Sequence, residues 1–192
     1  MPGMTFIRTV PRNEAEGELA DLYKRAGNPD GTVDHVMMIH SLNPPALRAH
    51  FELYVTAMHK KSPLSRVERE IVGTVVSRLN GCAYCQRHHA TGLQRILKGD
   101  RPGLGDALLT GEDSGLNTRE RAMVAYARKL TITPGEVSAE DVAPLRAAGL
   151  DDRAIHDLAQ VVAYFCYANR MVTGLGVDLE QDGVGQHPTL DS

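Results

Sequence analysis

Two cysteines and a histidine lie close together in this chain, at Cys82, Cys85 and His89. In the first turn of a helix, unpaired backbone N–H groups and the helix dipole favour the thiolate form of a cysteine. A thiolate attacks peroxides and disulfides, and a second thiol nearby can condense with the sulfenic acid that results. A histidine one turn further on can carry the proton. The motif therefore predicts thiol redox chemistry.

Helical geometry predicts which way these side chains point. At about 100° per residue, Cys85 and His89 fall within about 60° of Cys82, and Leu93 falls on the same stripe. We expect both sulfurs and this imidazole to face the interior, partly shielded. His88 lies about 100° from His89 and is expected at the rim or in solvent. Helix-terminus electrostatics favour Cys82 as the more acidic thiol, whereas a histidine relay favours Cys85, so the attacking cysteine stays open.

Glu70 completes the predicted catalytic set from a preceding helix. The apolar face of helix 65–79 is formed by Val67, Ile71, Val72, Val75, Val76 and Leu79. Glu70 lies on the other side, together with Gly73, Thr74 and Ser77. These small residues would let the cysteine-bearing helix pack closely and bring the carboxylate to His89. A carboxylate there orients an imidazole and raises its basicity.

The remaining sequence indicates a single all-α domain, residues 1–192, of about eight helices, because Gly and Pro separate segments of helical periodicity. The expected helices cover about 14–25, 33–41, 44–58, 65–80, 82–98, 104–110, 117–130 and 151–172.

Two of these helices begin alike. The segment Leu64-Ser65-x-x-Glu68-Arg69 is similar to Leu116-Asn117-x-x-Glu120-Arg121, which lies 52 residues later. Glu68 is expected to complete a capping box rather than to act in catalysis. In the second copy Ala122 replaces Glu70 and Pro134 replaces Cys82, so only the first copy carries the chemistry. An internal repeat and convergence through capping rules both explain the similarity.

Composition excludes several classes of function. The net charge of −3 and the dispersed basic residues do not indicate a nucleic-acid or anionic-membrane surface. No segment is apolar enough for a signal peptide or a membrane span, which predicts a cytoplasmic protein. Three cysteines are too few for a secreted disulfide scaffold. Cys166 lies in an apolar stretch and is expected to be a buried free thiol.

Zinc binding is the main alternative for the cysteine pair, because two thiolates and one or two imidazoles suffice for a tetrahedral site. Structural zinc sites usually draw on a second ligand pair, and no second C-x-x-C or C-x-x-H occurs here. We therefore predict no metal and no other cofactor. The other histidines are interpreted as ordinary core or surface residues: His35, His40, His50, His59, His156 and His187.

With these residues in view, the chain resembles the alkyl hydroperoxidase D type branch of the carboxymuconolactone decarboxylase superfamily. It is most similar to the group known as uncharacterised peroxidase-related enzymes. The family pattern of Glu, eleven residues, Cys-x-x-Cys, three residues and His is met by Glu70, Cys82, Cys85 and His89. Flanking segments agree over about residues 30 to 180: His40 to Pro44, Leu64 to Glu70, the pair His88-His89, Asn169-Arg170 and Gly174 to Gly176.

The resemblance implies an all-helical fold, homo-oligomers, and reduction of hydrogen peroxide or organic hydroperoxides through a disulfide cycle. It implies a dithiol reductant protein, either lipoyl-bearing or thioredoxin-like. Tyr84 stands where some members have a histidine, which puts the reductant and the rate in question. The decarboxylase branch lacks the cysteine pair. Alternatives are a disulfide reductase or lyase of the same fold, and a zinc-binding or redox-sensing interaction protein.

Overall fold

The computed structural model describes residues 4–181 and 183–186, and these residues form helices and loops without a strand. The predicted all-α fold is confirmed, with nine α-helices in the described part where about eight were expected. The helices are α1 (Gly17–Ala26), α2 (His35–Met38), α3 (Pro44–Met58), α4 (Arg66–Leu79), α5 (Ala83–Leu97), α6 (Leu104–Thr110), α7 (Thr118–Ile132), α8 (Ala139–Ala147) and α9 (Asp152–Gly174), with short 3-10 turns at Arg12–Glu14 and Pro134–Glu136.

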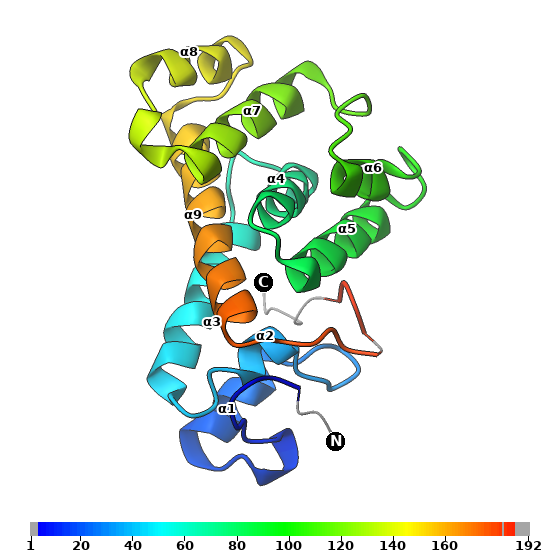
Figure 1. Ribbon diagram of the computed structural model, residues 1–192, viewed down its shortest axis with the longest axis vertical. Coiled ribbons are helices and arrows are strands. Elements are labelled where there is room, and N and C mark those ends of the chain that lie inside the picture. Colours follow the sequence, from blue (N-terminus) through cyan, green and yellow to red (C-terminus); the bar gives the residue numbers. More distant parts are fainter. Residues whose placement is uncertain (1–3, 182, 187–192) are drawn as a thin grey trace.

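Helix α4 lies at the centre of the molecule, surrounded by α5, α6, α7 and α9 (Figure 1). Every residue from 69 to 77 is buried, so α4 has no solvent face over this stretch. A helix buried all round has to satisfy its polar side chains internally. The charged and polar residues of α4 therefore make specific contacts with the helices around them.

A tight turn places the cysteines directly after α4. Gly81 takes the left-handed conformation with φ of 69°, which glycine adopts without strain. The Cys82 N–H donates to the Ser77 carbonyl at 3.0 Å, and Cys82 becomes the N-cap of α5. Helices α4 and α5 consequently run as an antiparallel pair, which brings Glu70 and the first turns of α5 to the same region.

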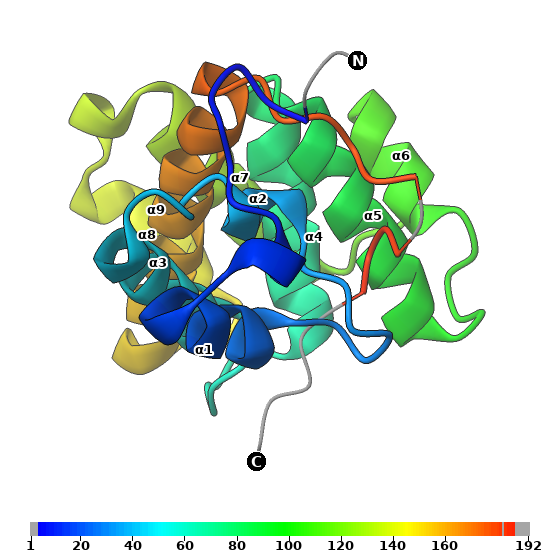
Figure 2. The ribbon, with the colours of Figure 1, turned by 90° about the horizontal axis from the view of Figure 1, so that it is seen from below.

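Helix α9 is the longest of the described helices and packs against α3, α4 and α7 (Figure 1). After α9 the chain leaves helical structure and passes beside α5 (Figure 2). Its first residues pair with the N-terminal segment, through Phe6 N to Leu175 O at 2.8 Å and Asp178 N to Met4 O at 2.9 Å. Among the described helices, none combines the length and the apolarity that crossing a membrane requires.

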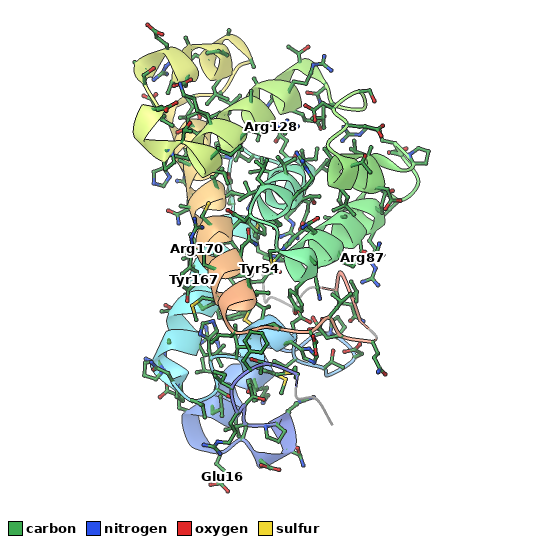
Figure 3. The ribbon with its side chains drawn as sticks, viewed as in Figure 1. Glu16, Tyr54, Arg87, Arg128, Tyr167 and Arg170 are labelled. Atoms are coloured by element: carbon green, nitrogen blue, oxygen red, sulfur yellow. The ribbon has the colours of Figure 1, made fainter. Side chains whose placement is uncertain are left out.

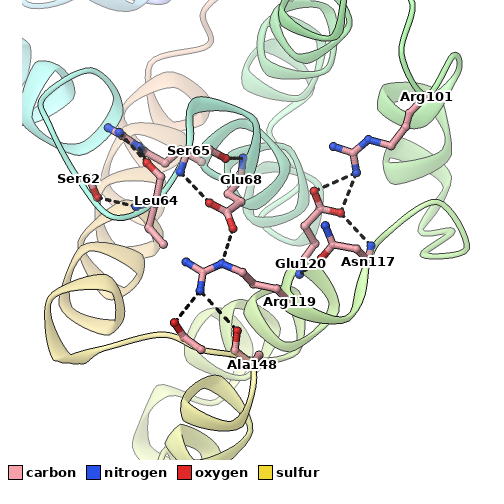
Figure 4. Close-up of polar contacts among 11 residues, drawn as sticks. Ser62, Leu64, Ser65, Glu68, Arg101, Asn117, Arg119, Glu120 and Ala148 are labelled. Carbon is pink, nitrogen blue, oxygen red and sulfur yellow. Dashed lines mark hydrogen bonds and ion pairs between the residues drawn. The ribbon is translucent and has the colours of Figure 1, made fainter.

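Side-chain caps define most helix starts. Both predicted capping boxes form, Ser65 with Glu68 and Asn117 with Glu120 (Figure 4). Glu68 also accepts from Arg119 at 2.7 Å, which joins the start of α4 to that of α7. The capping role predicted for Glu68 is confirmed. Such caps typically contribute about 1 kcal/mol each.

Several helix boundaries differ from the prediction. Helix α2 spans only four residues, and α1 begins three residues later than expected, after the 3-10 turn. Helix α8 was not predicted, because Pro144 lies inside it and its apolar residues form no clear stripe. Its N-terminal capping box, formed by Ser138 and Asp141, was the available signal.

A buried histidine pair is expected to make the stability of the fold depend on pH. His50, on α3, is 1% exposed and meets Tyr164 of α9, and its ring centroid lies 4.6 Å from that of His40. Burial, reinforced by the neighbouring His40, lowers the pKa of His50 to about 3. The unfolded chain, with a histidine pKa of 6.5, therefore binds this proton over a pH range where the folded protein does not.

We expect this one residue to lower the free energy of unfolding as pH falls from about 6.5 towards 3, by at most about 1.4 kcal/mol per pH unit. Above pH 6.5 the His50 ring is neutral in the folded and the unfolded chain, so the protein keeps the full free energy of unfolding there. Urea unfolding at a series of pH values, compared with His50→Gln, measures it. The variant should show the shallower dependence on pH, and parallel curves for the two proteins would show that His50 is not the source.

Candidate active site

The two cysteines of the motif are both buried, at 2% exposure for Cys82 and 4% for Cys85. Hydrogen bonds from the Cys85 thiol and backbone N–H, and from Thr173 and Asn169, lower the pKa of Cys82 to about 7 against the opposing effect of burial. The hydrogen bond between the two cysteines has the opposite effect on the pKa of Cys85, which donates it. Donation to Cys82, together with burial, raises the pKa of Cys85. Of the two thiols, Cys82 is therefore the more readily ionised.

Glu70 and His89 are in direct contact, as the sequence predicted. His89 Nδ1 lies 2.6 Å from Glu70 Oε2, and Arg66 Nη2 donates to Glu70 Oε1 at 2.8 Å. The Glu70 side chain is fully buried, and that of His89 is 12% exposed. Glu70 is therefore held between an arginine and an imidazole, which fixes the orientation of the ring. A hydrogen bond from Nδ1–H leaves Nε2 as the basic nitrogen.

Two of the small residues of α4, Gly73 and Ser77, contact α9, whereas the prediction placed the cysteine helix against this stripe. A Cβ on Gly73 would lie 2.3 Å from the ring of Phe165, so only glycine leaves room for that ring. Ser77 Oγ accepts from Asn169 at 3.2 Å. The Phe165 ring in turn meets His89 edge-on, with centroids 4.5 Å apart. The predicted stripe therefore positions His89 indirectly, through a side chain of α9.

A pocket opens next to these groups. Cys85 and His89 both line it, and Cys82 does not. Most of its wall is aromatic or apolar, including Tyr54, which lies in the interior between α9 and α5 (Figure 3). The complete lining is Asp34, Val36, Met37, Tyr54, Tyr84, Cys85, His88, His89, Tyr164, Phe165, Ala168 and Gln186. A small molecule in this pocket would meet Cys85 and His89 together.

The prediction that His88 lies at the rim or in solvent was wrong. His88 is only 7% exposed, because the segment after α9 covers it. Its Nε2 lies 2.7 Å from Glu180 Oε2, and its Nδ1 accepts from the Gly185 N–H at 3.3 Å. Its ring also stacks on Tyr84, with centroids 4.5 Å apart. A helical wheel gives the direction of His88 but not what packs over it.

Glu180 is a charged residue next to the site that sequence reasoning missed. It accepts from Tyr84 OH at 2.6 Å and from the His35 backbone N–H at 2.6 Å, in addition to its contact with His88. Burial opposes its ionisation, but these hydrogen bonds and the charge of His88 lower the pKa of Glu180 to about 2. It lies in a loop far along the chain from the motif, where no periodicity or spacing marks it.

Glu70, Cys82, Cys85 and His89 all fall inside residues 44–97, which match the model of the carboxymuconolactone decarboxylase family. A solved structure, an uncharacterized peroxidase-related protein from Silicibacter sp. TM1040, is 32% identical, with a TM-score of 0.73 over 79% of this chain and 78% of that chain. The chain belongs to the same family as this peroxidase-related protein, within the carboxymuconolactone decarboxylase superfamily.

Two other solved structures share this alkyl hydroperoxidase D-like fold. One is an alkylhydroperoxidase AhpD core, a peroxidase-related protein from Ralstonia eutropha JMP134 (24% identity, TM-score 0.82, 94% of this chain and 95% of that chain). The other is the debrominase Bmp8 (18% identity, TM-score 0.75, 94% of each chain). A search of curated proteins finds no match. Among the described residues, no three His, Cys, Asp or Glu side chains group as metal ligands would.

Proposed function

We propose that this protein is a thiol-dependent peroxidase that reduces hydrogen peroxide or organic hydroperoxides. The observation that carries the proposal is the shared pocket, where Cys85 lies beside His89 and a buried Glu70 supports the imidazole. Thiol, base and orienting carboxylate are the parts that activate a sulfur nucleophile. The name of the Silicibacter relative, a peroxidase-related protein, agrees with this chemistry.

The pocket favours Cys85 as the attacking residue, although Cys82 has the lower pKa. One proton leaves the cysteine pair, and His89 with Glu70 is placed to take it up and relay it. The remaining proton lies in the hydrogen bond from Cys85 to Cys82. Moving this proton to Cys82 makes Cys85 the thiolate without further ionisation. Access to the pocket then decides which sulfur meets the peroxide.

The electrons balance over two steps. The Cys85 thiolate attacks the terminal oxygen, the O–O bond breaks, and Cys85 becomes a sulfenic acid while an alkoxide leaves and is protonated. The Cys82 sulfur then attacks the Cys85 sulfur, water leaves, and a disulfide forms. An external dithiol returns the two electrons. We propose a lipoyl-bearing or thioredoxin-like protein for this step, and a cytoplasmic homo-oligomer as the working form.

Mass spectrometry after one equivalent of peroxide tests the function. The reduced protein should lose two hydrogen atoms, and proteolysis should yield a peptide cross-linked between Cys82 and Cys85. Dihydrolipoamide should then restore the thiols and support turnover. Protein that stays reduced, or that forms only sulfinic acid, would refute the disulfide cycle.

A second candidate is reductive dehalogenation of a small aromatic compound. The debrominase Bmp8 shares the fold, and a variant of it has been solved with 2,3,4-tribromopyrrole. The wall of the pocket described above contains four aromatic side chains, Tyr54, Tyr84, Tyr164 and Phe165. The cysteine pair would supply two electrons as hydrogen replaces bromide. Bromide release from bromopyrroles, measured beside peroxide consumption with the same reductant, separates the two reactions.

A further inference from the structure

Asp34 contributes a carboxyl group to the pocket that no part of the thiol machinery uses. It lies just before α2 and lines the same pocket as Cys85 and His89. Aspartate at an N-cap usually bonds to a backbone N–H of its own helix. The Asp34 side chain makes no such cap. Its carboxyl group therefore serves something other than the start of α2.

A hydrogen bond holds this carboxyl in place. Asn28 Nδ2 donates to Asp34 Oδ1 at 2.7 Å and to Thr32 Oγ1 at 3.1 Å. Asn28 is itself buried, at 6% exposure. The loop before α2 thus directs Asp34 towards the pocket through a buried amide.

The surroundings of Asp34 favour its protonated form. Burial raises its pKa most and the negative charge of Glu180 adds to this, while His88, the Asn28 hydrogen bond and His35 lower it. Asp34 interacts electrostatically with titratable groups from four helices and from the segment after α9. These groups are His35, Tyr54, Tyr84, His88, Tyr164 and Glu180. Glu180, nearby, is shifted in the opposite direction. When the pKa values of two neighbouring carboxyl groups are shifted apart, one often stays protonated and acts as an acid while the other stays ionised.

The other polar groups of the pocket are less suited to donate a proton. Burial raises the pKa of Tyr84 and Tyr164 well above the usual value for tyrosine, and raises that of Tyr54 too. Both ring nitrogens of His88 are engaged by the segment after α9.

Two further pocket residues are also excluded. In the proposed reaction His89 takes up the thiol proton, and the carboxylate of Glu70 then stabilises the protonated ring, which makes it a weaker proton donor. The amide of Gln186 is not an acid. Asp34 is the remaining acid among the described residues of the pocket.

We propose that Asp34 is the general acid that protonates the leaving oxygen while Cys85 attacks the hydroperoxide. This inference rests on the proposed peroxidase function. As the S–O bond forms and the O–O bond breaks, the electron pair of that bond goes to the leaving oxygen. The proton of the Asp34 carboxyl passes to this oxygen, and an alcohol leaves instead of an alkoxide. Solvent re-protonates the Asp34 carboxylate before the next turnover. Proton removal from sulfur and proton delivery to oxygen are thus assigned to separate groups.

Two oxidants of similar size test this assignment, ethyl hydroperoxide and peracetic acid. Ethoxide is a strong base and needs a proton when it leaves, whereas acetate does not. The measurement is the rate of the first oxidation of reduced protein, quenched with a thiol-alkylating reagent and read by mass spectrometry, at one mildly acidic pH. It requires no reductant. Asp34→Asn keeps the shape of the side chain, and Asp21→Asn, an exposed residue of α1, is the matched control.

We expect Asp34→Asn to slow oxidation by ethyl hydroperoxide about 100-fold, the range of general-acid catalysis, and to change the rate with peracetic acid less than about 3-fold. Asp21→Asn should match the wild type with both. Equal loss with both oxidants would show a structural role and overturn the inference, as would an unchanged rate with ethyl hydroperoxide. A wild-type protein that reacts with neither oxidant would instead overturn the peroxidase proposal itself, and the inference with it.

Discussion

Cys85→Ser is expected to lower the rate of oxidation by peroxide roughly 1,000-fold or more, because loss of a catalytic nucleophile removes most of the rate enhancement. Cys85 lines the pocket, and Cys82 lies outside it at 2% exposure. Cys82→Ser should behave differently. Its Cys85 can still attack once, but no thiol remains beside it to form the disulfide, so dithiol-dependent turnover should stop. A sulfenic-acid probe such as dimedone should label this variant stoichiometrically, and should not label Cys85→Ser.

Cys166→Ser is the matched control, because Cys166 lies on α9 outside the pair and half-buried. It should keep both the rate and the intramolecular disulfide. If Cys85→Ser were labelled as fast as Cys82→Ser, the low-pKa thiol would be the nucleophile. The role proposed for the pocket would then be wrong.

The parts of the site that sequence predicts are those governed by local rules. Ser65 and Asn117 each mark a helix start, because a cap acts over three residues. Cys82, Cys85 and His89 share one helix, so their spacing fixes their relative directions. Glu70 was added because a stripe of small residues was expected to receive the cysteine helix. Part of that stripe packs on α9 instead, but the short turn between α4 and α5 still brings Glu70 to His89.

The missed parts depend on segments without periodicity. Asp34 lines the pocket, and Glu180 holds Tyr84 and His88 of its wall. The two lie in loops near opposite ends of the chain. Their positions follow from the path of the backbone and from single contacts, such as Asn28 to Asp34. His88 was misplaced for the same reason. Its angle on the helix predicts that its side chain faces solvent, but the non-helical segment after α9 covers that side of the helix.

Glu70→Gln should lower the rate of peroxide oxidation by about 100-fold to 10,000-fold while the protein stays folded. The carboxylate accepts from His89 Nδ1–H, which leaves Nε2 free to take a proton. An introduced amide can donate to Nδ1 and stabilise the other tautomer, in which Nε2 carries the proton and is no longer a base. It also removes the negative charge that stabilises the imidazolium. Its oxygen can still accept from Arg66, which keeps the buried contact with α4 satisfied. The rate of first oxidation, measured by quenching and mass spectrometry, reports the effect.

Glu68→Gln provides the matched control, since it makes the same change two residues away on α4. Glu68 caps the helix and pairs with Arg119, and it does not line the pocket. Its loss of charge should lower the free energy of unfolding by about 1 kcal/mol or less and leave the oxidation rate unchanged. Similar rates for both variants would mean that the contact of Glu70 with His89 is structural. The expected result is a slow oxidation rate and a normal urea midpoint for Glu70→Gln, together with a normal rate for Glu68→Gln. It would assign the loss of rate to His89, because of the two glutamates only Glu70 contacts its imidazole.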